Sequence, residues 1–180
     1  MLHDVDPPHT HWQLKSPIHA HYINTLLKYY PQASIIMPHR CLNEVIPSAC
    51  SLFLSLLSHY FNEDDIPNLK IMLGQMIPKF IDITIDRIFE FNSRESSRKN
   101  VFNIQYKDLI TDPIGTVHRI YDHFHFLQWS NEFEKAMRLW LIENPQGKQG
   151  RHSYSLNEFH LETQMNKQLY KDYEKLFLST

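Results

Sequence analysis

Arg40 and Ser48, a cation and a hydroxyl eight positions apart, are the residues whose spacing best suits an anion site in this sequence. Arg40 follows the apolar run Ser34–Met37, which is typical of a buried parallel strand, and Ser48 falls in the early turns of the helix expected next. An arginine fork and a hydroxyl near a helix N-terminus can share one phosphate group. The spacing also allows a purely structural interpretation, in which Arg40 pairs with a surface carboxylate and Ser48 packs against another helix.

Lys15 and His19 form a second candidate pair, earlier in the chain. Lys15 ends a short strand expected over residues 11–15, and a lysine there could stabilise charge that develops on a transferring group. His19 falls in the first turn of the following helix, close to Lys15, and could act as a general base at neutral pH. The alternatives are a surface lysine and a solvated or packed histidine.

The segment G-K-Q-G-R-H at residues 147–152 gathers Lys148, Arg151 and His152 around two glycines. Glycine lets the backbone approach a ligand closely, and three potential cations suit a phosphate. The alternative is a flexible basic loop without a ligand.

The twelve histidines also raise the possibility of a metal site. His9 and His11 would face the same way on an extended segment, with Asp4 and Asp6 nearby. No third ligand is fixed by the spacing and no C-x-x-C pair occurs, so a metal-binding protein is a minor alternative and no metal is expected. The two cysteines do not make a disulfide framework, and they are compatible with a reducing compartment.

The elements that must position these residues alternate between strand and helix, which predicts an α/β fold with a parallel sheet and right-handed crossovers. Strands are expected over residues 11–15, 34–37 and 101–106. Helices are expected over residues 18–30, 43–61, 67–93, 112–124, 131–142 and 162–177, from apolar periodicity and from Asn, Asp and Pro at their starts.

Length and charge narrow the class of protein. With 180 residues and a net charge of −2, one domain is expected, and nothing global points to nucleic acid or to an anionic membrane. Only four glycines occur, and neither G-x-G-x-x-G nor G-x-x-x-x-G-K-[ST] is present, which weighs against a self-contained nucleotide-binding domain.

The most apolar run, residues 45–61, is too short to span a membrane, and residues 1–11 do not read as a secretory signal, so the default compartment is the cytoplasm.

Four segments, taken in order, resemble the sulfotransferase superfamily, in the broad branch that includes tyrosylprotein-type enzymes. They are W-x-L-K-S-P-x-H at Trp12–His19, H-R followed by a serine eight residues later, Y-x-D-L-x-x-D-P at Tyr106–Pro113, and G-R-H-x-Y-x-L at Gly150–Leu156. The resemblance spans nearly the whole chain. It implies a P-loop-NTPase-like three-layer sandwich with a parallel sheet, rich in helices.

The resemblance also implies a reaction, the transfer of a sulfuryl group from 3′-phosphoadenosine 5′-phosphosulfate to a hydroxyl or amine, with no metal required. Arg40 and Ser48 would hold the 3′-phosphate, Lys15 would stabilise the leaving oxygen at the 5′-phosphosulfate, and Tyr106 would lie near the nucleotide. The late loop that closes over the phosphates would contribute Lys148, Gly150 and Arg151. His19 is the candidate base, although this branch often takes its base from a glutamate further upstream.

One departure from the family is large. The family begins with a strand and a loop of the P-R-S-G-T-T type that wraps the 5′-phosphosulfate, and no such sequence occurs here. We therefore expect residues 1–180 to form a single, N-terminally incomplete domain that lacks its first strand. The alternative function is a catalytically inactive, truncated or degenerate relative that acts as a nucleotide-binding or interaction module, with self-association through an exposed sheet edge. The acceptor, whether small molecule, carbohydrate or protein, is not identified, and the helix over 67–93 is expected to form a wall of its pocket.

Overall fold

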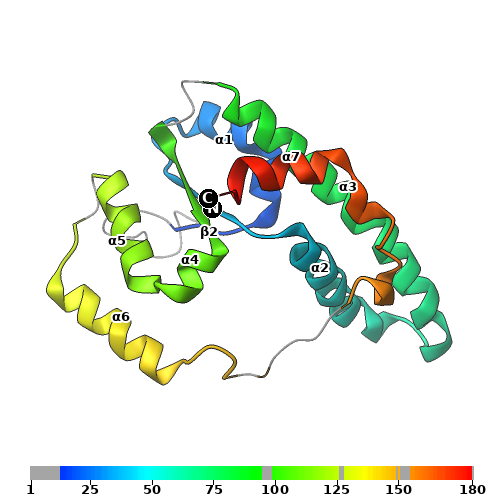
Figure 1. The fold of residues 1–180 in the computed structure, drawn as a ribbon. Helices are drawn as coiled ribbons and strands as arrows, with labels where there is room; N and C mark the ends of the chain where they lie inside the picture. Colours follow the sequence, from blue (N-terminus) through cyan, green and yellow to red (C-terminus); the bar gives the residue numbers. More distant parts are fainter. Residues whose placement is uncertain (1–12, 95–98, 126–127, 149, 151–154, 180) are drawn as a thin grey trace.

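The computed structural model describes residues 13–94, 99–125, 128–148, 150 and 155–179. Figure 1 shows two strands near the centre, with helices α2, α3 and α7 on one side and helices α4, α5 and α6 on the other. The elements, in chain order, are η2 Pro17–Tyr22, α1 Ile23–Tyr29, β1 Ile35–His39, α2 Leu42–Leu57, η3 Ser58–Tyr60, η4 Glu63–Asp65, α3 Ile66–Asn92, β2 Val101–Gln105, α4 Tyr106–Thr111, α5 Pro113–His123, α6 Asn131–Glu143, η6 Asn157–Phe159, η7 Gln164–Asn166 and α7 Gln168–Phe177.

Strands β1 and β2 pair in parallel, with Ile35 opposite Val101 and His39 opposite Gln105. Parallel neighbours need a long crossover, and helices α2 and α3 form part of the connection here. Both strands lie close to the ranges predicted from their apolar runs. The described residues therefore form a helix-rich α/β fold with a small parallel sheet, while the three-layer arrangement and the handedness of the crossover stay predictions.

The largest hydrophobic cluster lies between α2, α3 and the C-terminal segment. Helix α7 runs beside α3 in Figure 1, and its buried Tyr170 and Tyr173 belong to this cluster. Phe159 is fully buried against Gly74 of α3, where a Cβ atom would overlap the carbonyl oxygen of Phe159. The other buried members are Leu42, Ile46, Cys50, Leu69, Leu73, Ile77, Ile85 and Leu161.

The prediction of a strand over residues 11–15 is wrong for residues 13–15, the part that the structure describes. Residues 13–15 adopt no regular structure, and a 3-10 helix begins at Pro17. A strand needs a hydrogen-bonded partner, and in the described part of the chain β1 and β2 pair only with each other. The helix predicted over 18–30 is divided into η2 and the shorter α1.

Two predicted helix starts are also wrong. Helix α2 begins at Leu42 with Cys41 as its N-cap, so Asn43 lies inside the helix rather than capping it. Helix α7 begins at Gln168 instead of 162, because Lys167 has extended backbone angles and ends the preceding 3-10 turn. Helix α4, which follows β2 directly, was not predicted.

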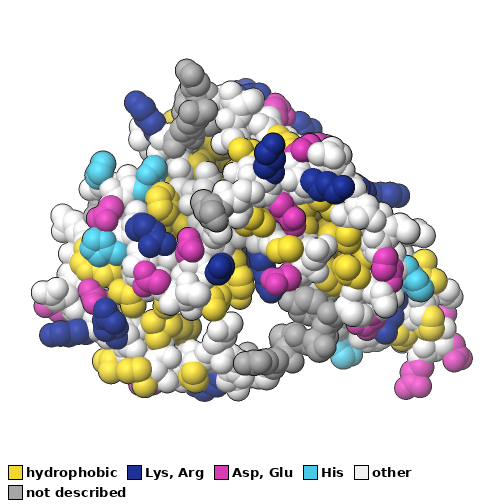
Figure 2. All heavy atoms as spheres, viewed as in Figure 1, with side chains coloured by type: hydrophobic (Ala, Val, Ile, Leu, Met, Phe, Trp, Pro, Cys, Tyr) yellow, Lys and Arg dark blue, Asp and Glu magenta, His cyan; other side chains and the backbone are white. Residues whose placement is uncertain are grey.

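No helix among the described residues is long and apolar enough to cross a membrane. Figure 2 shows a surface on which charged and hydrophobic side chains alternate, with an opening through its lower part. The turn that follows α6 passes along the lower rim of this opening, while the strands lie above it (Figures 1 and 2). This turn and the carboxyl ends of the strands are therefore on opposite sides of the opening in this view.

The close approach of Gly74 to Phe159 leads to a test of the core. We expect Gly74→Ala to lower the free energy of unfolding by about 1–3 kcal/mol, because the added methyl group forces α3 and Phe159 apart. Alanine is the better helix former by roughly 1 kcal/mol, so a purely local effect would have the opposite sign. Urea denaturation measures the change, and Gln75→Ala, at an exposed neighbouring position, is the control. A stabilised Gly74→Ala variant would contradict this packing.

Candidate functional site at the carboxyl ends of the strands

Arg40 and Tyr106 are the residues that follow β1 and β2 directly, and the parallel pairing brings them together. The guanidinium carbon of Arg40 lies 4.5 Å from the centre of the Tyr106 ring. Such a cation–π contact stabilises by roughly 0.5–1 kcal/mol when it is exposed, and it holds the guanidinium plane in place. Ligands in open α/β sheets bind beyond the carboxyl ends of the strands, which is where this pair lies.

Arg40 also pairs with Glu44 in the first turn of α2. Its Nε atom lies 2.6 Å from Glu44 Oε2, with 30% of the arginine side chain and 55% of the glutamate side chain exposed. An ion pair this exposed contributes at most about 1 kcal/mol. The carboxylate pairing that the sequence allowed for Arg40 is thus present, and it comes from the adjacent helix.

Ser48 lies one helical turn beyond Glu44 and is partly buried. Residues four apart on an α-helix share one face, so Ser48 and Glu44 lie on the same side of α2. Because Glu44 contacts Arg40, the predicted Ser48 lies on the face of α2 that Arg40 contacts. A cation, a carboxylate and a hydroxyl therefore follow one another along this face.

His39, the last residue of β1, is 1% exposed and lies at the centre of a buried polar network. Its Nε2 donates to Asn103 Oδ1 at 2.8 Å, which leaves Nδ1 to accept from the Tyr173 hydroxyl, also at 2.8 Å. The ring stacks on Phe177 with 4.0 Å between centroids. Burial lowers the pKa of His39, although the hydrogen bond to Asn103 acts against this, so the imidazole is neutral at neutral pH.

Helix α7 supplies the cap that α2 lacks. The Cys41 N-cap makes no side-chain cap bond, and Glu174 Oε1 accepts instead from the Leu42 backbone N–H at 3.1 Å and from Cys41 Sγ at 3.4 Å. A carboxylate at a helix N-terminus is favoured by the free N–H groups and by the helix dipole. Sequence reasoning missed Glu174 and Tyr173, because neither is close in sequence to the strand end that it contacts.

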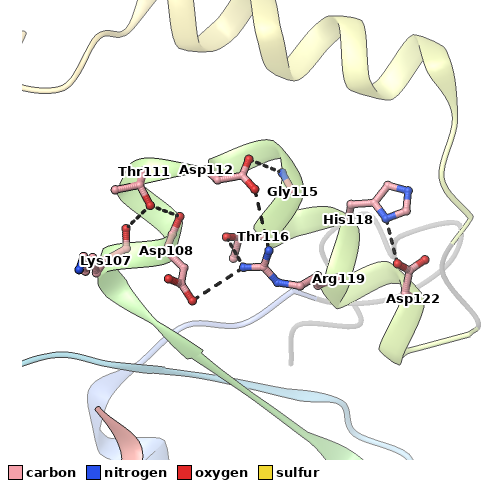
Figure 3. Close-up of polar contacts among 9 residues, drawn as sticks. All are labelled: Lys107, Asp108, Thr111, Asp112, Gly115, Thr116, His118, Arg119 and Asp122. Carbon is pink, nitrogen blue, oxygen red and sulfur yellow. Dashed lines mark hydrogen bonds and ion pairs between the residues drawn. The ribbon is translucent and has the colours of Figure 1, made fainter. Parts of the chain in front are cut away.

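The motif Y-x-D-L-x-x-D-P joins α4 to α5, as Figure 3 shows. Asp108 and Asp112 both point at Arg119, with N–O distances of 3.8 and 3.9 Å. Asp112 caps α5 by accepting from the Gly115 N–H at 2.9 Å, and a Cβ atom on Gly115 would overlap the Asp112 carboxylate. The motif's acidic residues are thus structural, and they anchor the short helix that begins with Tyr106.

Lys15 and His19 lie near the start of the described chain. Lys15 is exposed in a segment without regular structure. His19 is partly buried in η2, where its backbone N–H donates to the Ser16 carbonyl at 3.2 Å. Their predicted roles at a phosphosulfate stay predictions.

The late loop is only partly described. Lys148 Nζ donates to the Glu143 carbonyl at 2.7 Å and contacts Asn144 Oδ1 at 3.3 Å, so it binds the end of α6. Gly150 has a φ of 95°, a conformation that favours glycine. Arg151 and His152 lie outside the described residues, as do the candidate metal ligands near the N-terminus. Among the residues that the structure does describe, no three His, Cys, Asp or Glu side chains gather to hold a metal ion.

A cavity of about 220 Å³ lies beside β1 and β2, against the last turns of α3. The C-terminal turns of this helix line the cavity. That the helix forms a wall of an acceptor pocket stays a prediction. The lining residues are Met37, Ile88, Phe91, Asn92, Val101, Asn103 and Phe177.

Comparison with protein-family models matches residues 1–131 to the sulfotransferase family. The structure is similar to the crystal structure of sulfotransferase STF9 from Mycobacterium avium, with a TM-score of 0.75 and 26% sequence identity. The match covers 92% of this chain and 41% of the mycobacterial chain, so the present chain spans less than half of that relative's length. A search of curated proteins found no match.

The buried imidazole predicts how stability depends on pH. Because the folded-state pKa of His39 is lowered, the unfolded chain takes up the proton first, and the stabilisation is lost as pH falls below the ordinary value of 6.5. We expect the free energy of unfolding to fall between pH 7 and pH 5 by at most about 1.4 kcal/mol per pH unit from this group. His39→Gln replaces the imidazole with an amide, which can form hydrogen bonds but does not titrate.

Urea denaturation at several pH values compares wild type with His39→Gln, and His125→Gln, at an exposed position, is the control. The difference between wild type and His39→Gln should shrink as the pH falls. An equal difference at every pH would show that protonation of His39 does not destabilise the fold.

Proposed function

Because the chain belongs to the sulfotransferase family, we propose that it binds 3′-phosphoadenosine 5′-phosphosulfate and takes part in sulfuryl transfer to a hydroxyl or amine acceptor. The observation that carries this proposal is Arg40 stacked on Tyr106 where two parallel strands end. The motifs in Tyr106–Pro113 and Gly150–Leu156 support the broad branch that includes tyrosylprotein-type sulfotransferases.

The donors around the β1–α2 junction are of the types that a phosphate needs. Arg40 offers a guanidinium fork, Ser48 a hydroxyl on the same helix face as Glu44, and α2 its N-terminal N–H groups. We assign Arg40 and Ser48 to the 3′-phosphate, and Tyr106 to a position beside the nucleotide. Each charged hydrogen bond of this kind is worth roughly 1.5–3 kcal/mol.

The remaining roles concern the reacting group. The donor supplies an activated sulfuryl group whose bridging oxygen gains negative charge as it leaves. In this proposal Lys15 stabilises that charge and His19 takes the proton of the acceptor hydroxyl. Lys148, Gly150 and Arg151 belong to a loop that closes over the phosphates. The cavity beside α3 is the proposed acceptor site, and its lining combines apolar side chains with the amides of Asn92 and Asn103.

A second candidate function is nucleotide binding without turnover. The observation that favours it is the environment of the proposed catalytic lysine. Lys15, the proposed catalytic cation, is exposed in a segment of irregular structure. Binding and turnover measured on the same sample separate these two functions.

Isothermal titration with 3′-phosphoadenosine 5′-phosphate tests the phosphate site. We expect Arg40→Ala to raise the Kd roughly tenfold to a hundredfold, because it removes a charged hydrogen-bonding fork. Arg40→Lys should recover only part of the affinity, since an ammonium keeps the charge but not the fork. Arg138→Ala is the matched control, because Arg138 also pairs with a glutamate four residues away but lies on α6.

Binding that is the same in wild type and in Arg40→Ala would rule out the proposed phosphate site. Turnover of a labelled sulfuryl donor with a mixture of phenols and alcohols is then the stricter measurement. Nucleotide binding that depends on Arg40 but gives no transfer would favour the second function.

A further inference from the structure

Two neighbouring residues of α7 hold the whole junction between β1 and α2, residues 39–42. The Tyr173 hydroxyl bonds to the His39 ring and to the backbone of Arg40. The Glu174 carboxylate takes the Leu42 N–H and contacts the thiol of Cys41. The end of a strand and the start of the next helix are therefore both bound by an element more than 130 residues later in the chain.

The Glu174 carboxylate lies where an incoming phosphate would find the N–H groups of α2. It is an anion bound at a helix N-terminus, which is the type of group that such a terminus attracts. The Arg40 guanidinium, next along the chain, contacts a second internal carboxylate, that of Glu44. The two glutamates differ in origin, because Glu44 belongs to α2 itself whereas Glu174 reaches it from α7.

We propose that Glu174 determines the affinity of this site for phosphate, because its carboxylate competes with the nucleotide's 3′-phosphate for the N-terminus of α2. This inference rests on the proposed function. When the phosphate binds, it takes the place of the carboxylate, and α7 loses the contact that Glu174 makes with the junction. The contact through Tyr173 is neutral and is retained. Phosphate binding and the docking of α7 therefore oppose each other.

Glu174→Gln separates the charge of the side chain from its hydrogen bond. The amide oxygen of glutamine can still accept from the Leu42 N–H, but it neither repels a phosphate nor interacts as strongly with the helix terminus. In isothermal titration with 3′-phosphoadenosine 5′-phosphate we expect this variant to bind about fivefold more tightly than wild type. Asp172→Asn is the matched control, because it removes the same charge from α7 at an exposed position that bonds to Gln168, and it should leave the Kd unchanged.

Amide hydrogen exchange gives a second measurement. If Glu174 had only a structural role, the nucleotide would not change the exchange rate in α7. Addition of the nucleotide to wild type should increase exchange in the peptide that contains α7, and in Glu174→Gln this increase should be smaller. Thermal unfolding verifies that each variant is folded.

The outcomes distinguish this inference from the proposed function. If wild type binds the nucleotide through Arg40 but Glu174→Gln binds equally or more weakly, the competition is overturned and the phosphate site stands. Decreased exchange in α7 on nucleotide binding would also overturn it. If no variant binds the nucleotide, both the proposed function and this inference fail.

Discussion

The parallel pairing of β1 and β2 is the constraint on which the candidate site depends. In the observed register His39 lies opposite Gln105, so that Arg40 and Tyr106 leave the sheet at the same edge and come into contact. Side chains alternate between the two faces of a strand, and a slip by one residue would turn each of them to the other face. His39 would then leave the core, and Arg40 would lose its position beside the aromatic ring.

The buried polar network around His39 explains why this register is specific. An apolar strand end would tolerate a slip with only a loss of packing, whereas His39 must find its two hydrogen-bond partners on β2 and α7. A buried polar group without partners costs about 1–3 kcal/mol, whereas the net gain of one hydrogen bond is about 1 kcal/mol. Asn103 and Tyr173 thus align the strands, and they also anchor α7 to the sheet. The position of Arg40 therefore depends on α7, a helix that is far from Arg40 in the sequence.

Local sequence signals predicted much of the fold. The features that were missed depend on contacts between residues far apart in the sequence. Apolar runs located β1 and β2 to within about two residues, and Asp112-Pro113 marked the start of α5, because strand and cap signals lie within a few neighbouring positions. The strand expected to end at Lys15 failed because pairing depends on a partner that no local pattern reveals. Arg40 was chosen by its place after a predicted strand and its spacing from Ser48, and Tyr106 by resemblance; the structure brings the two together. Glu174 could not be found, because a glutamate on an amphipathic helix has no distinguishing signal.

The carboxylates of Glu44 and Glu174 stabilise the junction between β1 and α2 in the absence of a ligand. An arginine and a helix N-terminus without anions would leave a cation and free N–H groups to be satisfied by water alone, and this becomes costly where the surroundings are partly buried. Glu44 and Glu174 satisfy these groups from within the chain. A phosphate would then exchange with a carboxylate of similar hydrogen-bonding capacity, so that only the difference between the two anions contributes to its affinity. In the proposed competition, the same contacts that hold the junction in place therefore weaken its binding of a phosphate.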